Sequence, residues 1–244
     1  MKPARYWSWL WVVLGIFYFF LPLYATFLFS LRARRGVLSF DAYHNVLIDP
    51  KFASTFLFSL QMAFWTVVVG SLLVVPTVYW VHLRLPRARA FVELVTLMPF
   101  VIPAVVLVFG LIRTYAPFFT WVIAGRIVLV AGYVVLSLPY MYRAVDTGLR
   151  AIDVRSLTEA AQSLGAGWPT ILLRVILPNL RVALLSGAFL TLAIVIGEYT
   201  LAALLAQPAF GPYMALLGQN RAYEPAALAV MSFAITWAAM GLIQ

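Results

Sequence analysis

Residues 156–180 read SLTEAAQSLGAGWPTILLRVILPNL, a polar segment between two long apolar blocks. Glu159, Gln162, Arg174 and Asn179 all lie within it. Charged side chains are costly in the hydrocarbon core of a bilayer, so this segment is expected to lie outside the lipid. The flanking blocks, in contrast, are suited to crossing the membrane.

The composition is that of an integral membrane protein. Of the 244 residues, 64% are hydrophobic and 10% are charged, whereas an ordinary soluble domain carries about 25% charged residues. The net charge of +9 comes from basic residues scattered between apolar runs, which favours membrane-flanking arginines over a nucleic-acid site. The chain has no cysteine, and its two histidines, His44 and His82, lie far apart in the sequence, so no metal site is expected.

Long apolar segments predict an all-α, polytopic membrane protein with six transmembrane helices, because about 20 apolar residues cross a bilayer as a helix. The six candidate spans are Tyr6–Leu31, Phe56–Leu83, Phe91–Ile112, Arg126–Tyr142, Val182–Leu205 and Ala226–Leu242. The first is too long for the core of a signal peptide and is expected to remain as a membrane helix.

Several spans contain internal prolines, at positions Pro22, Pro76, Pro99, Pro103 and Pro139. Membrane helices tolerate proline where neighbouring helices satisfy the freed backbone groups. Kinked helices around a pathway and ordinary bundle packing are both consistent with these positions, and proline alone does not distinguish them.

Within the polar segment, the sequence predicts two short helices separated by a tight turn. Ser156 and Glu159 have the S-x-x-E spacing of a capping box, so a helix is expected to begin at Ser156 and to run to Leu164. Gly165 then stands where a left-handed C-terminal cap favours glycine. A second helix is expected to start at Pro169, since proline suits the first helical position.

A plain, well-capped loop between membrane helices would explain these caps. It would not explain a polar segment that reaches from Arg143 to Arg181, because most connections are far shorter and long ordered ones are usually functional. Ala160 and Ala161 give the first helix a smooth side that the backbone of a partner could approach closely.

The spacing of this segment resembles the EAA motif of ABC importer permeases. Glu159-Ala160-Ala161 is followed after three residues by Gly165 and after nine more by Val175-Ile176-Leu177-Pro178, with valine where the family usually has isoleucine. The runs SLPYMYRAVDTGLRAID and FDAYHNVLIDPKFASTFLFSLQMAF also resemble this family, as do the prolines in LMPFVIPAVVLVFGL. The resemblance covers the chain from about Phe40 to its end, and the pattern is most similar to the spermidine/putrescine-type branch.

The resemblance implies the six-helix fold of type I ABC importer permeases, with residues 1–244 forming a single transmembrane domain. Residues 143–181 would form a cytoplasmic coupling loop, because in this family the motif segment docks in a cleft of the ATP-binding subunit. The residues that the resemblance assigns to coupling are Ser156, Glu159, Ala160, Ala161, Gly165, Ala166, Leu177 and Pro178.

The chain lacks a G-x-x-x-x-G-K-[ST] phosphate loop, so it is not expected to bind ATP by that route. The resemblance implies a non-catalytic subunit with no cofactor of its own, while ATP and Mg are bound by partner ATPase subunits. It also implies a second permease subunit, expected to be a paralogue, and an extracytoplasmic solute-binding protein. The lipid membrane is a further expected partner, and nucleic acid is not.

Such a transporter must switch between inward-facing and outward-facing states, which requires a bistable packed bundle. Small residues at close helix contacts are expected to permit this switch. The candidates are Gly70, Gly110, Gly132, Gly187 and Gly197.

Six spans place both termini on one side of the membrane, and the basic residues indicate which. Ten of the 17 lysines and arginines lie on the side of the N-terminus and seven on the other, which favours a cytoplasmic N-terminus. The cluster of arginines at positions 32–35 argues the other way. The cytoplasmic role implied for residues 143–181 supports the first orientation, in a bacterial inner membrane.

Glu198 lies in the fifth predicted span, within AIVIGEYTLAALL, where a charge costs about 2.5–3.5 kcal/mol. It is expected to face the bundle interior or a water-filled cavity. One interpretation is a substrate contact or gate in the translocation pathway; the other is a buried carboxyl satisfied by neighbouring hydroxyls. The resemblance adds that permeases of this family often carry an acidic residue followed by an aromatic one here, as Glu198 and Tyr199 do.

The substrate is expected to be a polyamine or a similar small organic ion, on the resemblance to that branch. Ferric iron, sulfate, thiamine and phosphonate are the alternatives within the family. A proton-coupled secondary transporter that uses Glu198 is a different class of function, but such proteins usually carry more intramembrane ionisable groups and inverted repeats. A membrane enzyme would need a cluster of reactive side chains that the sequence does not bring together.

Overall fold

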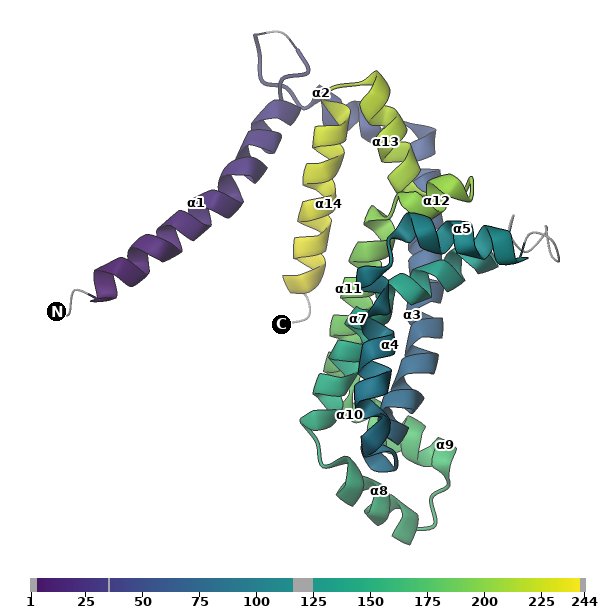
Figure 1. Cartoon of the computed structure of the whole chain (residues 1–244). Coiled ribbons are helices and arrows are strands. Elements are labelled where there is room, and N and C mark those ends of the chain that lie inside the picture. Colours follow the sequence, from purple (N-terminus) through teal and green to yellow (C-terminus); the bar gives the residue numbers. More distant parts are fainter. Residues whose placement is uncertain (1–3, 35, 116–124, 242–244) are drawn as a thin grey trace. The chain divides into compact units, whose positions relative to one another are not determined.

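The computed structural model describes residues 4–34, 36–115 and 125–241, and these residues form helices without any strand (Figure 1). The chain divides into two compact units. Unit 1 comprises residues 1–54 and 213–244, and unit 2 comprises residues 55–212. Each unit is described by itself.

Unit 1 is built on the pairing of its first and last helices. Helix α1 (Ala4–Ser30) packs along α14 (Glu224–Gly241), and the Phe20 and Trp237 rings meet edge to face at 6.1 Å between centroids. The short helix α2 (Asp41–Leu47) packs against α14 as well. There, Asn45 Nδ2 donates to Glu224 Oε1 at 3.3 Å.

Unit 2 contains most of the remaining helices, four of which run side by side (Figure 1). These four are α3 (Pro50–Leu83), α4 (Arg89–Val101), α7 (Arg126–Arg150) and α11 (Arg181–Gly197). One end of unit 2 carries α8 (Val154–Ser163) and α9 (Trp168–Thr170), and the other carries α5 (Ala104–Tyr115) and α12 (Thr200–Leu204). The shorter elements of unit 2 are η1 (Pro86–Ala88), the π-helical η2 (Ile171–Ile176) and α10 (Leu177–Asn179). Helix α13 (Phe210–Asn220) begins in unit 2 and continues into unit 1.

Two clusters of buried side chains lie along α3 and α7. The α8-end cluster joins α3, α7, α8 and η2 through residues that include Tyr79, Met141, Leu149, Ala161 and Ile171. The α12-end cluster joins α3, α5, α7, α11 and α12 through residues that include Met62, Val108, Leu129, Val195 and Leu201. Unit 2 therefore has a separate core at each end of its helix bundle.

Among the described residues, three continuous helices are long and apolar enough to cross a membrane: Trp9–Ser30, Pro50–Leu83 and Arg126–Arg150. Two further spans are bent pairs of helices, which gives up to five. The predicted sixth span lies in α14, whose apolar stretch Glu224–Ile235 is shorter. The all-α, multi-span membrane architecture is confirmed, whereas the number six stays a prediction.

The predicted span Phe91–Ile112 is two helices rather than one, because α4 and α5 meet at an angle of 100°. Ile102 at the break is extended, with φ −88° and ψ 115°. The residue before a proline is disfavoured in the helical region, and Pro103 follows Ile102 directly. Pro76 and Pro139, in contrast, lie inside continuous helices. The sequence left open whether the prolines kink their helices or only pack within the bundle. At Pro103 the chain bends sharply.

Close glycine contacts occur at some of the predicted positions and at two that the sequence did not indicate, Gly148 and Gly211. An added Cβ at Gly187 would lie 2.9 Å from Met141 Sδ, and one at Gly132 would overlap the Leu201 side chain. Gly70, Gly110 and Gly197 have open space within 4 Å, so the prediction of close contacts is wrong for these three within the described chain. Gly148 was not predicted, yet a Cβ there would lie 2.6 Å from Ala183 Cβ.

Substituting Gly148 by Ala should destabilise the protein, because the new methyl group would force α7 and α11 apart. Overpacking of this kind costs about 1–3 kcal/mol. The matched control is Gly70→Ala, where the added methyl group meets open space and alanine favours the helix by up to about 1 kcal/mol. Thermal unfolding of the purified protein in detergent measures both. Equal melting temperatures for the two variants would contradict the close α7–α11 contact.

Candidate functional site

Helix α8 begins two residues before the predicted start, and its N-cap is Asp153. The Asp153 carboxylate accepts from the backbone N–H of Ser156 at 3.1 Å and from Ser156 Oγ at 2.6 Å. These bonds lower the pKa of Asp153 below its ordinary value, the side-chain bond most of all. The predicted capping box is therefore wrong: Ser156 donates to the cap, and Glu159 pairs with Arg155, with 2.8 Å between Nε and Oε1.

The C-terminal end of α8 confirms the predicted role of Gly165. This glycine has φ +79°, a left-handed conformation that residues with a Cβ rarely adopt. Gly165 N–H donates to the carbonyl of Gln162 at 2.9 Å, and Ala166 N–H donates to the carbonyl of Ala161 at 3.0 Å. The two bonds form a Schellman motif, which satisfies carbonyl groups that the helix end leaves free.

The second predicted helix starts at Trp168, one residue before Pro169, with Gly167 as its N-cap. It continues from α9 into η2, where the backbone widens into a π-helix, and then into α10. The Leu177 side chain is half-buried in α10, and Pro178 is exposed. The sequence predicted this helix correctly but gave no sign of its π-helical part.

One face of α8 is attached to the rest of unit 2. Val154, Thr158 and Ala161 are buried on it, at the spacing that places residues on one side of a helix. The hydroxyl groups of Tyr79 on α3 and Thr158 are 2.9 Å apart, a bond that contributes about 0.5–1.5 kcal/mol. Beyond the turn, the ring of Trp168 lies 4.3 Å from that of Trp80, between centroids. This face positions α8 on the end of α3.

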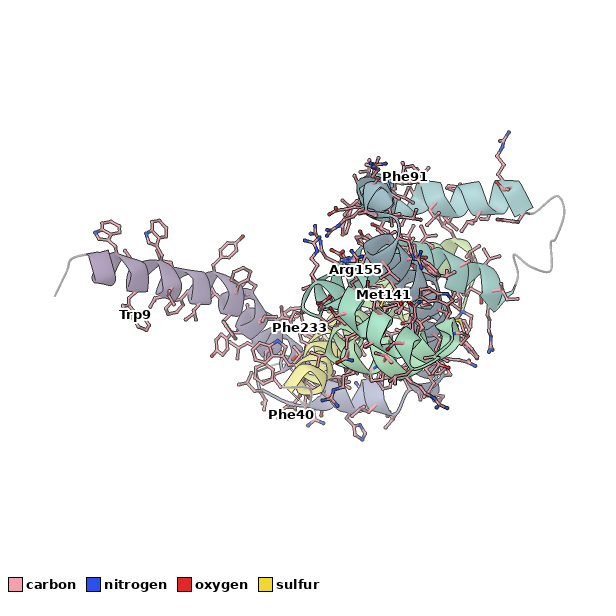
Figure 2. The ribbon with its side chains drawn as sticks, turned by 90° about the horizontal axis from the view of Figure 1, so that it is seen from below. Trp9, Phe40, Phe91, Met141, Arg155 and Phe233 are labelled. Carbon is pink, nitrogen blue, oxygen red and sulfur yellow. The ribbon has the colours of Figure 1, made fainter. Side chains whose placement is uncertain are left out.

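The opposite face of α8 is exposed and mostly polar. It presents Arg155, Glu159, Ala160, Gln162 and Ser163, and Figure 2 views unit 2 from this end, with Arg155 labelled. The two motif alanines therefore point in different directions: Ala160 is exposed, whereas Ala161 lies in the α8-end cluster.

Leu164 follows this exposed face and was missed by the sequence reasoning. Its side chain is 87% exposed, the largest exposed fraction among the large hydrophobic residues of the described chain. The available signal was its place directly before Gly165, since a helix ends there and its last side chain projects outward. Its place next to the exposed face of α8 makes this leucine a candidate contact for whatever protein that face binds.

The second predicted site lies where α11 ends. Glu198 is extended there, with φ −76° and ψ 126°, and its carboxylate turns towards the start of α12. The backbone N–H of Leu201 lies 3.0 Å from both carboxylate oxygens, and that of Ala202 lies 3.4 Å from Oε2. Backbone groups, rather than the neighbouring hydroxyls considered from the sequence, are thus the partners of this carboxylate.

The break beside Glu198 is tightly packed on one side and open on the other. An added Cβ at Gly211 would lie 2.9 Å from the carbonyl carbon of Glu198 and 3.1 Å from Tyr199 Cα, so only glycine allows this approach. The Tyr199 side chain is 51% exposed. The predicted span Val182–Leu205 is accordingly interrupted at these two residues.

The described ranges contain no group of three or more His, Asp or Glu that could hold a metal ion.

Comparisons with known proteins identify the family. Residues 55–244 match the family described as "Binding-protein-dependent transport system inner membrane component". The probable sulfate transport system permease protein cysT of Chlorella vulgaris is 30% identical over 172 residues, 64% of each chain. The methionine import system permease protein MetP of Bacillus subtilis is 30% identical over 122 residues, 50% of this chain and 52% of its own. The matched region therefore spans between half and two thirds of these relatives.

A solved structure supports the same fold. It is described as a bacterial ABC transporter involved in the import of the acidic polysaccharide alginate, with a TM-score of 0.69 and 16% identity. The match covers 98% of this chain and 94% of that one. Since the family match alone includes more than half of the residues, the chain belongs to the family of binding-protein-dependent transport system inner membrane components.

Proposed function

We propose that this chain is the permease subunit of an ATP-driven importer, and that α8 docks on a partner ATPase. The observation that carries the proposal is the two-sided construction of α8. Its inner face is attached to α3 through Thr158 and Ala161, its ends are both capped, and its outer face is exposed, with Leu164 at its tip. A helix held in this way can transmit movement from another protein into the bundle.

The proposed partners follow from the family description and from the chain itself. A transport system that depends on a binding protein includes, beside the membrane component, an extracytoplasmic solute-binding protein. The chain carries no phosphate loop, so ATP and Mg are assigned to ATPase subunits. A second permease subunit completes the pathway. The long helix α1 fits such an assembly, since its large side chains project along its whole length, Trp9 among them (Figure 2).

We propose that the substrate is a small polar solute, with sulfate as a better candidate than the polyamine expected from the sequence. The relative that matches over more residues is named for sulfate transport and the other for methionine import. Neither is named for a polyamine. Two relatives with the same 30% identity to this chain are thus named for chemically different solutes, an inorganic anion and an amino acid. Sequence similarity between permeases therefore does not follow the chemistry of the solute. Selection is therefore assigned mainly to the binding protein.

Replacing Leu164 by Asp should weaken binding of the ATPase by about tenfold or more, the effect of losing a contact worth about 1.4 kcal/mol. The control is Leu38→Asp, since Leu38 is 62% exposed but is assigned to the opposite side of the membrane. Co-purification of each variant with the partner ATPase measures binding, and uptake into vesicles measures transport. Undiminished binding and uptake for Leu164→Asp would contradict the docking of α8.

The proposed orientation places residues 84–89 and 143–181 in the cytoplasm and the Arg32–Arg34 region outside. Single introduced cysteines test it without background, because the chain has no cysteine. In intact cells, an impermeant thiol reagent should label Gly36→Cys and should spare Ser163→Cys until the membrane is opened. The reverse labelling pattern would overturn both the orientation and the docking of α8 on a cytoplasmic ATPase.

We also propose that Glu198 and Tyr199 border the translocation pathway. Glu198→Gln should raise sulfate uptake, because it removes a negative charge that repels the anion, while stability should stay nearly unchanged, because the amide oxygen can still accept a bond from α12. Glu198→Leu removes that cap and should cost about 0.5–2 kcal/mol of stability. Uptake of labelled sulfate into vesicles and the melting temperature of the complex separate these effects. Normal uptake by the Gln variant would exclude a role for the charge.

A further inference from the structure

A buried carboxylate joins three helix ends near α8. Asp146, one turn before the end of α7, has a side chain that is 5% exposed. Its Oδ1 lies 2.7 Å from His82 Nε2 at the end of α3, and Arg89 Nη2 at the start of α4 donates to both oxygens at 3.2 Å. We refer to His82, Arg89 and Asp146 as the Asp146 clamp. Arg150 also pairs with Asp146, at 2.6 Å, but within α7.

The clamp lies beside the anchors of α8. Tyr79, which bonds Thr158 of α8, precedes His82 by one turn on α3. Leu149 of α7 and Val154 of α8 belong to the same buried cluster, and Val92 of α4 packs against that cluster. A movement of α8 therefore acts directly on the helix ends that Asp146 connects.

Helix α4 leads from the clamp to the other end of unit 2. It packs along α7, where the rings of Phe100 and Tyr140 lie 5.4 Å apart. It then turns by 100° into α5, and α5 packs against α12, the helix that follows the break at Glu198. Figure 1 shows this course, with α4 running along the bundle and α5 turning away beside α12.

The ionic bonds of the clamp join particular side chains on α4 and α7, which the apolar contacts around it do not. A buried carboxylate needs partners on fixed positions, so a shift of α7 must carry Arg89 with it. Apolar contacts contain no directional bond that joins one side chain to a particular partner. Without the Arg89 bond, α4 would follow α7 only through such packing at its first turn.

We propose that the Asp146 clamp is the positioning device that passes movement of α8 on to α4, and through the bend at Pro103 to α5 and α12. The inference rests on the proposed function, since it takes α8 as the element that the ATPase moves. The role proposed for Asp146 and Arg89 is to hold helices in position, not to bind ATP or substrate. They position the helices that are proposed to move.

The test compares two arginine substitutions on the same carboxylate, in the assembled complex with its ATPase and binding protein. Arg89→Met removes the ionic bond between α4 and α7, whereas Arg150→Met removes an ion pair within α7 alone. We expect Arg89→Met to lower solute uptake per ATP hydrolysed by about fivefold or more, with ATP hydrolysis retained. Arg150→Met should keep the parental ratio, and Arg89→Lys should restore part of it, because lysine can still reach Asp146.

Equal ratios of uptake to ATP hydrolysis for the parent, Arg89→Met and Arg150→Met would overturn the inference. Equal losses in both variants would overturn it too, because a general effect of lost charge or stability would then explain them. If Arg89→Met does not assemble, Arg89→Gln and Arg150→Gln replace the pair under the same criteria. Failure of the proposed function is a separate result: the parental complex itself would then show no ATP-dependent uptake.

Discussion

The close approach of α7 and α11 determines the geometry of unit 2. Gly148 on α7 faces Ala183 on α11, and Gly187 on α11 faces Met141 on α7. A larger side chain at either glycine would push the two helices apart. Helix association inside a bilayer depends on such packing, because lipid tails are as apolar as the side chains. Helices α4, α5 and α12 also pack against α7, and their positions therefore depend on this contact.

Two helix breaks form at the end of unit 2 that lies away from α8, and each has its own physical cause. At Ile102, the proline that follows disfavours the helical conformation. At Glu198 no proline is present, and the break is stabilised by the carboxylate that accepts from Leu201 and Ala202 and by the close approach of Gly211. Buried backbone groups must find partners within the protein, which explains why a charged residue stands at this point of an apolar segment.

Unit 2 thus has polar attachments at its α8 end, where the chain also bends by 77° between Trp168–Asn179 and Arg181–Gly197, and two helix breaks at its other end. The α8 end is connected by a hydroxyl pair, stacked tryptophans and the Asp146 clamp. The α12 end is connected mainly by apolar side chains, with Val108, Leu201 and Ala202 in a common cluster. Apolar contacts allow alternative packings more readily than directional polar bonds do. This division is consistent with the proposed transfer of movement from α8 to the other end of unit 2.

The sequence determined those features whose cause is local. It predicted the left-handed turn at Gly165 and the helix towards Pro178, because caps and turns depend on bonds between residues a few positions apart. It also indicated the membrane-spanning, all-α class and the family. The N-cap was wrong by three residues, since Asp153 and Ser156 are both capable of capping, and only their mutual bond decides between them.

Tertiary structure decided the features that depend on distant residues. It placed Ala161 in the core and Ala160 outside, although the two are adjacent and chemically identical. It brought Arg89 to Asp146 across 57 positions of the chain, and it exposed Leu164 by ending a helix before it. Burial and ion pairing depend on which helices become neighbours, and no local pattern carries that information. The polar segment was therefore recognisable in the sequence, while the side chains that connect it to the bundle were not.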